Sequence, residues 1–182
     1  MEYIVLVVVV LALLYIISLY NGLVRLRNQV RNAWAQIDVQ LKRRHDLIPN
    51  LVEVVKDYMA YEQETLTRVV EARNMAIGAK GVEQTSRAEN MLTGALKSLF
   101  AVVENYPDLK SNRNVTQLQE ELTSTENKIA FARQYYNDSA MRINNRTEMF
   151  PSNIIASSFG FQREQYYEVP EEEKEVVRVD LR

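Results

Sequence analysis

The sequence contains no cysteine and only one histidine, His45, among its 182 residues. The missing cysteines exclude disulfide bonds, thiolate metal sites and a catalytic thiol. Glycine and proline are also scarce, at five and four residues, which disfavours a turn-rich β protein and favours long helices. The formal net charge is only -2, so the composition gives no reason to expect nucleic acid as a partner.

Motifs for catalysis, metal binding and cofactor binding are also missing. The segment around His45, RRHDLIPN, has no nucleophile elbow, and neither an HExxH zinc motif nor a glycine-rich phosphate loop occurs. One histidine cannot supply the Glu-x-x-His pairs of a di-metal bundle, so the acidic neighbours Glu120, Glu121 and Glu126 are interpreted as a solvated helix face. We therefore predict no catalytic, cofactor or metal site; the alternative is a hydrolase of unknown type.

An uncharged apolar stretch of eighteen residues runs from Tyr3 to Tyr20. At about 1.5 Å per residue it spans roughly 27 Å as a helix, close to the thickness of a membrane's hydrocarbon core. No basic residue precedes it and no small-residue cleavage site follows, which favours an anchor over a cleaved signal peptide. We predict a membrane anchor over residues 1–21, whose lipid-facing side chains include Ile4, Leu6, Leu11, Leu14, Ile17 and Tyr20.

Positive charge follows this stretch directly, at Arg25, Arg27 and Arg31, whereas the first acidic residue after Glu2 is Asp38. Positive residues flanking a span stay on the cytoplasmic side. The pattern predicts a single-pass membrane protein with its N-terminus outside and everything after Tyr20 in the cytoplasm. The same arginines would face anionic headgroups, which makes membrane lipid the first expected partner.

After the anchor, apolar residues recur at alternating steps of three and four, a spacing that places them on one face of a helix. A single Gly22 costs about 1 kcal/mol and does not have to break a helix, so the anchor is expected to continue into this stretch. The stripe could pack on other helices or, where exposed in a monomer, against a second copy; Trp34 is interpreted as a packing residue rather than part of a ligand cage. The stripe is Leu23, Leu26, Val30, Trp34, Ile37 and Leu41.

Pro49 lies inside a pattern that continues from Ile48 to Val70 and ends near Gly78 and Gly81. Either the helix kinks at Pro49 or a new helix starts there, and the unchanged phase of the stripe favours a kink. We expect the imidazole of His45 to cap or bond the backbone near this kink, since the proline frees the His45 carbonyl. Arg43 and Arg44 are interpreted either as contacts to phospholipid or an acidic partner, or as part of a solvated face.

Two further helices are expected, from about 84 to 104 and from an Asn cap near 112–114 to Phe150. The stripe of the last one has the spacing of a coiled-coil seam. The predicted fold is all-α, a transmembrane helix continuing into a long-helix antiparallel bundle of three or four helices over residues 22–161. The acidic remainder, 162–182, is expected to be mobile or to dock on a partner.

Several long stretches resemble the LemA family: YNGLVRLRNQVRNAWAQIDVQLKRRHDLIPNLVEVVKDY, MLTGALKSLFAVVENYPDLKSN, QLQEELTSTENKIAFARQYYND and FPSNIIASSFGF. The resemblance implies a bacterial inner-membrane protein with its N-terminus outside and a long-helix antiparallel bundle. It also implies two functional themes, association with membrane proteases or envelope stress, and membrane shaping in magnetosome-associated relatives.

The functional hypothesis is a non-enzymatic, membrane-anchored scaffold or adaptor at the bacterial inner membrane. We expect it to be a homo-oligomer that organises a membrane or cytoplasmic protein partner not identified by the sequence. The alternative is a self-assembling protein that shapes membranes.

Overall fold

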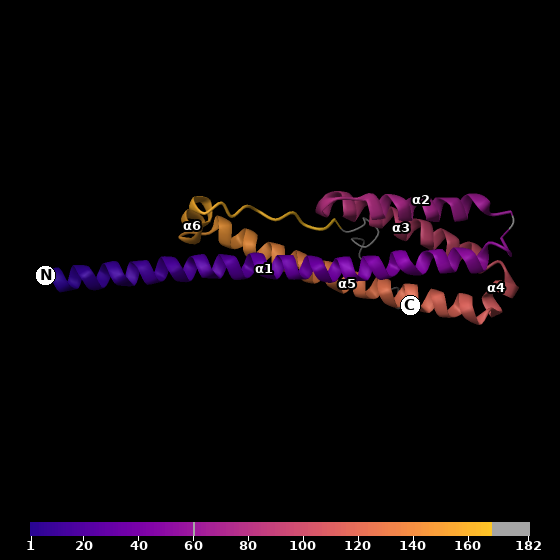
Figure 1. Ribbon diagram of the computed structural model, residues 1–182, viewed down its shortest axis with the longest axis horizontal. Coiled ribbons are helices and arrows are strands. Elements are labelled where there is room, and N and C mark those ends of the chain that lie inside the picture. The colour runs from indigo at the N-terminus through magenta and orange to yellow at the C-terminus, as the bar shows by residue number, and fades with distance from the viewer. Residues whose placement is uncertain (60, 169–182) are drawn as a thin grey trace, which may run out of the picture. The chain divides into compact units, whose positions relative to one another are not determined.

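The computed structural model describes residues 1–59 and 61–168, and its regular elements in these ranges are all helices (Figure 1). The predicted all-α class is confirmed for this part of the chain. The chain divides into two compact units: unit 1 holds Met1–Asp38 and Ala130–Tyr166, and unit 2 holds Val39–Ile129 with the residues from Tyr167. The helices are α1 (Glu2–Val55), α2 (Gln63–Gly78), α3 (Gly81–Val103), α4 (Pro107–Ser111), α5 (Arg113–Glu148) and α6 (Ser152–Ser158).

Helix α1 is a single helix of 54 residues that passes through both Gly22 and Pro49. The anchor therefore does continue into the following stripe, and the alternative in which a new helix starts near Pro49 is wrong. A proline leaves the carbonyl four residues earlier without its helical partner. Here Nε of Arg73, from α2, donates to the carbonyl oxygen of His45 at 2.7 Å, which replaces the lost bond.

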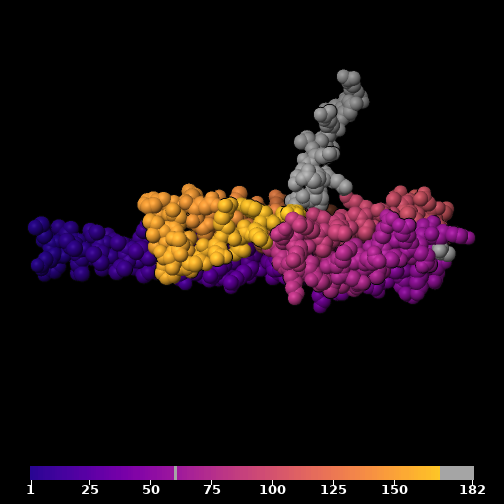
Figure 2. Space-filling view, turned by 90° about the horizontal axis from the view of Figure 1, so that it is seen from above, coloured from indigo at the N-terminus to yellow at the C-terminus, as the bar shows by residue number. Residues whose placement is uncertain are grey.

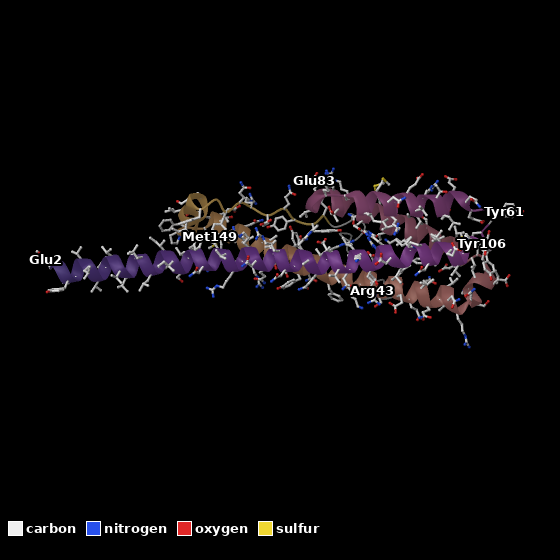
Figure 3. The ribbon with its side chains drawn as sticks, in the orientation of Figure 1. Glu2, Arg43, Tyr61, Glu83, Tyr106 and Met149 are labelled. Carbon is white, nitrogen blue, oxygen red and sulfur yellow. The ribbon has the colours of Figure 1, made fainter. Side chains whose placement is uncertain are left out.

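The first helix ends earlier than the stripe predicts. The pattern was expected to continue through residue 70, but α1 ends at Val55 and α2 begins at Gln63. Residues 56–62 contain neither glycine nor proline, so no local signal marks this turn. Met59 is fully buried in it, and the Tyr106 hydroxyl, labelled in Figure 3, donates to the carboxylate of Glu62. The reversal lets α2 bury its apolar face on the end of α1, which a straight helix could not do.

Unit 2 is organised around one apolar core. Helices α2 and α3 lie side by side and run in opposite directions (Figure 1), joined by Ala79 and Lys80. Gly81 opens α3 with φ +75°, a backbone conformation that L side chains rarely adopt. The predicted helix from 84 to 104 agrees with α3 to within a turn. The core is formed by Ile48, Leu51, Val55, Met59, Leu66, Val69, Ala72, Ala76, Leu92, Leu96, Leu99, Val103, Leu109, Val115 and Leu122.

Helix α5 begins where an asparagine can cap it. The Asn112 side-chain oxygen accepts a hydrogen bond from the backbone N–H of Asn114 at 2.9 Å, as the predicted cap requires. The helix then runs to Glu148, and its second half belongs to unit 1. The predicted end at Phe150-Pro151 is therefore close to the observed one.

Unit 1 has a small apolar core of its own, which forms because of the way α6 ends. The N–H of Phe161 donates to the carbonyl of Ala156 at 2.9 Å, and the N–H of Gly160 donates to that of Ser157 at 3.4 Å. This pair of bonds is a Schellman motif, and Gly160 has the positive φ, +70°, that the motif requires. The motif turns Phe161 back onto Ala156 and Leu23 of α1, where all three are buried.

The segment after α6 is attached to α5 through Glu164 and Gln165. The Asn144 side chain donates to the Glu164 carbonyl at 3.0 Å and accepts from the Glu164 N–H at 2.8 Å. The Tyr136 hydroxyl donates to the Gln165 carbonyl at 2.9 Å, and burial raises the pKa of this phenol to about 12. The predicted tail begins at 162, yet residues 162–168 carry such contacts, and Tyr167 is buried. The remainder of the predicted tail, 169–182, lies outside the described residues.

Candidate functional site

The first candidate site is the apolar beginning of α1. Residues 1–18 are exposed all around the helix, and Figure 2 shows this part of unit 1 uncovered on the visible face. An 18-residue window has a mean hydropathy of 2.8 with none of it buried. Of the predicted anchor residues, Ile4, Leu6, Leu11, Leu14 and Ile17 are all more than half exposed, and Tyr20 is half-buried. This is the one candidate span among the described residues, and it fits a membrane location.

The three arginines after this span have different surroundings. Arg25 and Arg31 are exposed, whereas Arg27 is half-buried. The Arg27 guanidinium lies 4.9 Å from the centre of the Phe161 ring, a cation–π geometry. Arg27 therefore contributes to the packing of unit 1 as well as to its charge.

The apolar stripe that follows is mostly covered within the chain. Leu23, Val30, Ile37 and Leu41 are buried, and Leu26 and Trp34 are half-buried. The Trp34 ring meets the Tyr136 ring edge-on, with centroids 5.5 Å apart. Little of the stripe is left for a second copy to cover.

The second candidate site is a cluster of charged side chains inside unit 2. The side chain of Arg44 is 0% exposed, and its guanidinium pairs with the carboxylates of Glu89 and Glu126. It also donates to the Thr93 hydroxyl at 3.0 Å and to the Glu89 carbonyl at 3.3 Å. The interpretation of Arg44 as a lipid contact or a solvated residue is wrong. Glu126, which was expected on a solvated face, is partly exposed, at 31% of its side chain, and also pairs with Arg44. Arg43, labelled in Figure 3, does face solvent, where it pairs with the similarly exposed Glu121 at 2.5 Å.

His45 completes the cluster. Its Nε2 lies 2.7 Å from Oε1 of Glu89, so the expectation that its imidazole bonds the backbone near Pro49 is wrong. It is the His45 carbonyl, not the ring, that takes part in repairing the helix at Pro49. Burial alone would raise the pKa of Glu89, but the bonds from His45 and Arg44 outweigh it and hold the pKa below its usual value. Glu89 is therefore ionised at neutral pH.

The chemistry of this cluster is that of an internal ion network. The Arg44 guanidinium pairs with both carboxylates, and no group of three or more metal-ligating side chains occurs among the described residues. An apolar groove of about 270 Å³ lies beside it, lined by Leu96, Phe100 and Leu122 among others. Buried ion pairs add little net stability but favour one packing over others, because each alternative leaves a charge unpaired. The arrangement supports a structural role.

Glu89 was not among the candidate residues, yet the sequence carried a signal for it. It lies in phase with Leu92, Leu96 and Leu99 on the buried face of α3. Arg44 is likewise in phase with Leu41 and Ile48 on α1. An acidic residue and a basic residue, each at a buried position in the apolar stripe of its own helix, together indicate an interhelical ion pair.

These features define an all-helical protein in which one candidate membrane helix is continuous with the helical units. The chain belongs to the LemA family, whose family model matches residues 33–181. The resemblance noted in the sequence is thereby confirmed.

Individual relatives are distant. The chain is 27% identical over 166 residues to "Protein LemA" of Metamycoplasma hominis, covering 88% of this chain and 72% of that protein. It is 25% identical over 175 residues to "Magnetosome protein MamQ 2" of Paramagnetospirillum magneticum, covering 82% and 64%. It is 25% identical over 174 residues to "Magnetosome protein MamQ" of Magnetospirillum gryphiswaldense, covering 81% and 64%. The chain thus spans just under two thirds of the length of these two magnetosome proteins.

Proposed function

We propose that this chain is a non-enzymatic scaffold or adaptor, anchored by the start of α1 in the bacterial inner membrane. The observation that carries the proposal is the contrast within one helix. Residues 3–18 are exposed and almost entirely apolar, and the stripe that follows is mostly covered by other parts of the chain. Water would solvate the first part poorly, whereas lipid hydrocarbon matches it on every side.

An anchor explains this helix better than a cleaved signal sequence does. Tyr20 and Leu23 belong to the same helical stretch as the span, and they pack on Phe161 and its neighbours in unit 1. Cleavage next to the span would cut into this packing. The exposed Arg25 and Arg31 support an orientation with the N-terminus outside and the chain after the span in the cytoplasm.

The scaffold role rests on the character of unit 2. Its helical segments are proposed to form an antiparallel four-helix bundle. The buried side chains of Arg44 and Glu89 contact each other, and His45 contacts Glu89, so these groups are already engaged within the bundle. Such a bundle offers rigid outer faces for a membrane or cytoplasmic protein. Confinement to the membrane raises the effective concentration of partners and of further copies, so that no single strong contact is needed.

The test is crosslinking in cells with the full chain, followed by mass spectrometry. We expect a reproducible set of partner peptides linked to lysines of unit 2, such as Lys97 and Lys110, together with links between copies. A matched chain whose span is replaced by an unrelated transmembrane helix should keep these links, because the partner contacts lie outside the span. Recovery of intramolecular links alone would contradict the scaffold proposal.

Orientation is tested separately by cysteine labelling, since the natural chain has no cysteine. Met75 is 49% exposed in unit 2, so Met75→Cys places a single accessible thiol there. A membrane-impermeant maleimide should label it only after the cells are lysed. Labelling of intact spheroplasts would reverse the proposed topology.

A second function, self-assembly that shapes the membrane, is favoured by the similarity to proteins named as magnetosome proteins. It predicts large homo-oligomers in detergent and altered vesicle shape on reconstitution. Sizing of the purified chain and electron microscopy of the vesicles test it, and a strictly monomeric particle with unchanged vesicles would contradict it.

A further inference from the structure

Unit 1 carries a second group of exposed apolar side chains besides the span. Met149 and Phe150 precede α6, Ile154 lies on it, and Phe159 follows it. Their exposed fractions run from 54% to 79%. Four large apolar residues exposed within eleven positions form an apolar patch on the surface. Such patches mark a contact with a membrane or with another protein.

The position of α6 on α1 indicates which phase this is. The Phe159 ring centroid lies 4.8 Å from that of Tyr20, and the Phe161 centroid lies 5.8 Å from it. Along α1, the uninterrupted run of exposed residues ends at Ser18, Tyr20 is half-buried, and Leu23 is buried. Tyr20 and Leu23 are three residues apart, which corresponds to a rise of about 4.5 Å along the helix. The α6 end of unit 1 therefore lies at the level where the span leaves the hydrocarbon, in contact with the last residues of the span.

The charges at the same end of unit 1 have one predominant sign. Residues 18–31 and 142–164 hold six arginines and two glutamates, a formal charge of 6 - 2 = +4. One of the glutamates, Glu148, pairs with Arg163 at 3.0 Å. The fold thus adds the arginines of the α5 end to those that follow the span.

A groove lies among these charges. It has a volume of about 370 Å³ and is lined by Arg25, Gln29 and Gly22 from α1, and by Arg146 and Ser152 from the other side. Nothing lies within 4 Å of the position that a Cβ on Gly22 would occupy, so the missing side chain keeps this part of the groove open.

We propose that α6 and its flanking residues form an interfacial membrane contact in addition to the span. Phe150, Ile154 and Phe159 enter the boundary between headgroups and acyl chains, and the groove between Arg25 and Arg146 binds the phosphate of an anionic phospholipid. The bilayer is the occupant because the patch is continuous with the span, so the membrane that holds the span already lies against it. The contact rests on the proposed anchor and would fix the tilt of unit 1 against the membrane.

The test uses single-cysteine variants of the full chain in vesicles of phosphatidylcholine and phosphatidylglycerol. Leu11→Cys, Ile154→Cys and Met91→Cys each receive an environment-sensitive fluorophore, and spin-labelled lipids act as shallow or deep quenchers. Met91 is the matched control, since it is 56% exposed and Ile154 is 54% exposed, but Met91 belongs to unit 2. We expect deep quenching at Leu11, shallow quenching at Ile154 and none at Met91.

The outcomes separate the two proposals. Quenching at Leu11 with Ile154 as silent as Met91 would leave the anchor intact and overturn the interfacial contact. No quenching at Leu11 would overturn both. An equally strong signal at Met91 would show non-specific adsorption and would also overturn the contact.

The proposed phosphate site between Arg25 and Arg146 is tested by combining Ile154→Cys with Arg146→Gln or with Arg25→Gln. We expect each substitution to lower the preference of the site for spin-labelled phosphatidylglycerol over phosphatidylcholine by about fivefold. Arg113→Gln, which removes an exposed arginine of unit 2, should leave the preference unchanged. A preference that is absent from the parent chain, or that falls equally in all three variants, would overturn the phosphate site.

Discussion

Replacing Arg44 with leucine removes the guanidinium that lies between Glu89 and Glu126 in unit 2. Both Arg44 and Glu89 have fully buried side chains, so after the substitution Glu89 keeps a buried charge without its guanidinium partner. His45, at 2.7 Å, remains beside it and compensates in part. Breaking a buried pair by removing one partner costs about 3–5 kcal/mol, because the remaining ion is neither solvated nor paired.

The neighbouring residue supplies the matched control. Arg43 pairs with Glu121 at 2.5 Å, but these side chains are 47% and 41% exposed. An exposed pair contributes about 0–1 kcal/mol, because water and salt screen it. The two substitutions Arg44→Leu and Arg43→Leu are chemically identical and adjacent in the sequence, but they differ in the burial of the ion pairs that they break and in the number of partners that they leave.

Thermal and denaturant unfolding of the full chain in detergent, followed by circular dichroism, measures the difference. For a chain of this size, 3–5 kcal/mol lowers Tm by roughly 6–20 °C. The double variant Arg44→Leu/Glu89→Leu should cost less than the sum of its single variants, since it leaves no unpaired partner between these two positions. Equal effects of Arg44→Leu and Arg43→Leu, or strict additivity in the double variant, would refute the reasoning.

Three further predictions concern pH, the helix at Gly22 and the segment after α6. Because the pKa of Glu89 is lowered in the folded chain, its stabilising effect is present above the unfolded value of 4.5 and is lost as pH falls through the lower folded value. Glu89→Gln should be less stable than the parent at neutral pH and should lose less stability on acidification; parallel pH profiles from unfolding curves would contradict this. Gly22→Ala should raise the free energy of unfolding by about 1 kcal/mol, since the added methyl meets nothing within 4 Å and alanine favours helix; a lower Tm would show that the helix needs glycine there. Asn144→Ala removes both bonds to Glu164 and should expose residues 162–168 to limited proteolysis, with Asn145→Ala, at an exposed position, as the control; equal cleavage of the two variants would contradict the attachment.

The membrane contacts assign different tasks to neighbouring parts of unit 1. In the proposed arrangement the span provides the hydrophobic anchoring, and the α6 end provides orientation through Phe150, Ile154 and the arginines. The position of α6 on α1 depends on Gly160, whose positive φ completes the Schellman motif and brings Phe161 onto α1. The sequence FPSNIIASSFGF, which helped to indicate the family, is therefore the segment that links α6 to the end of the span.

Local patterns in the sequence were sufficient to predict the candidate span, the helical class and the cap at Asn112. Each depends on residues within one or two helical turns: an uninterrupted apolar run, a three-four spacing, or an Asn side chain beside the first N–H groups. The continuity of α1 through Gly22 and Pro49 could also be predicted, because the stripe keeps its phase across both residues.

The turn at 56–62, the Arg44–Glu89–His45 cluster and the attachment of residues 162–168 depended on the tertiary structure. The turn has no breaker residue, and it forms because burial of Leu66 and Val69 against the end of α1 outweighs a few helical bonds. The charges of Arg44 and Glu89 look like solvated positions until each is placed on the buried face of its own helix. The sequence by itself determined the helical class, most of the helical segments and the position of the candidate membrane span, since those properties are local. Only the tertiary structure decided which faces meet and which charges are removed from water, because these depend on residues far apart in the chain.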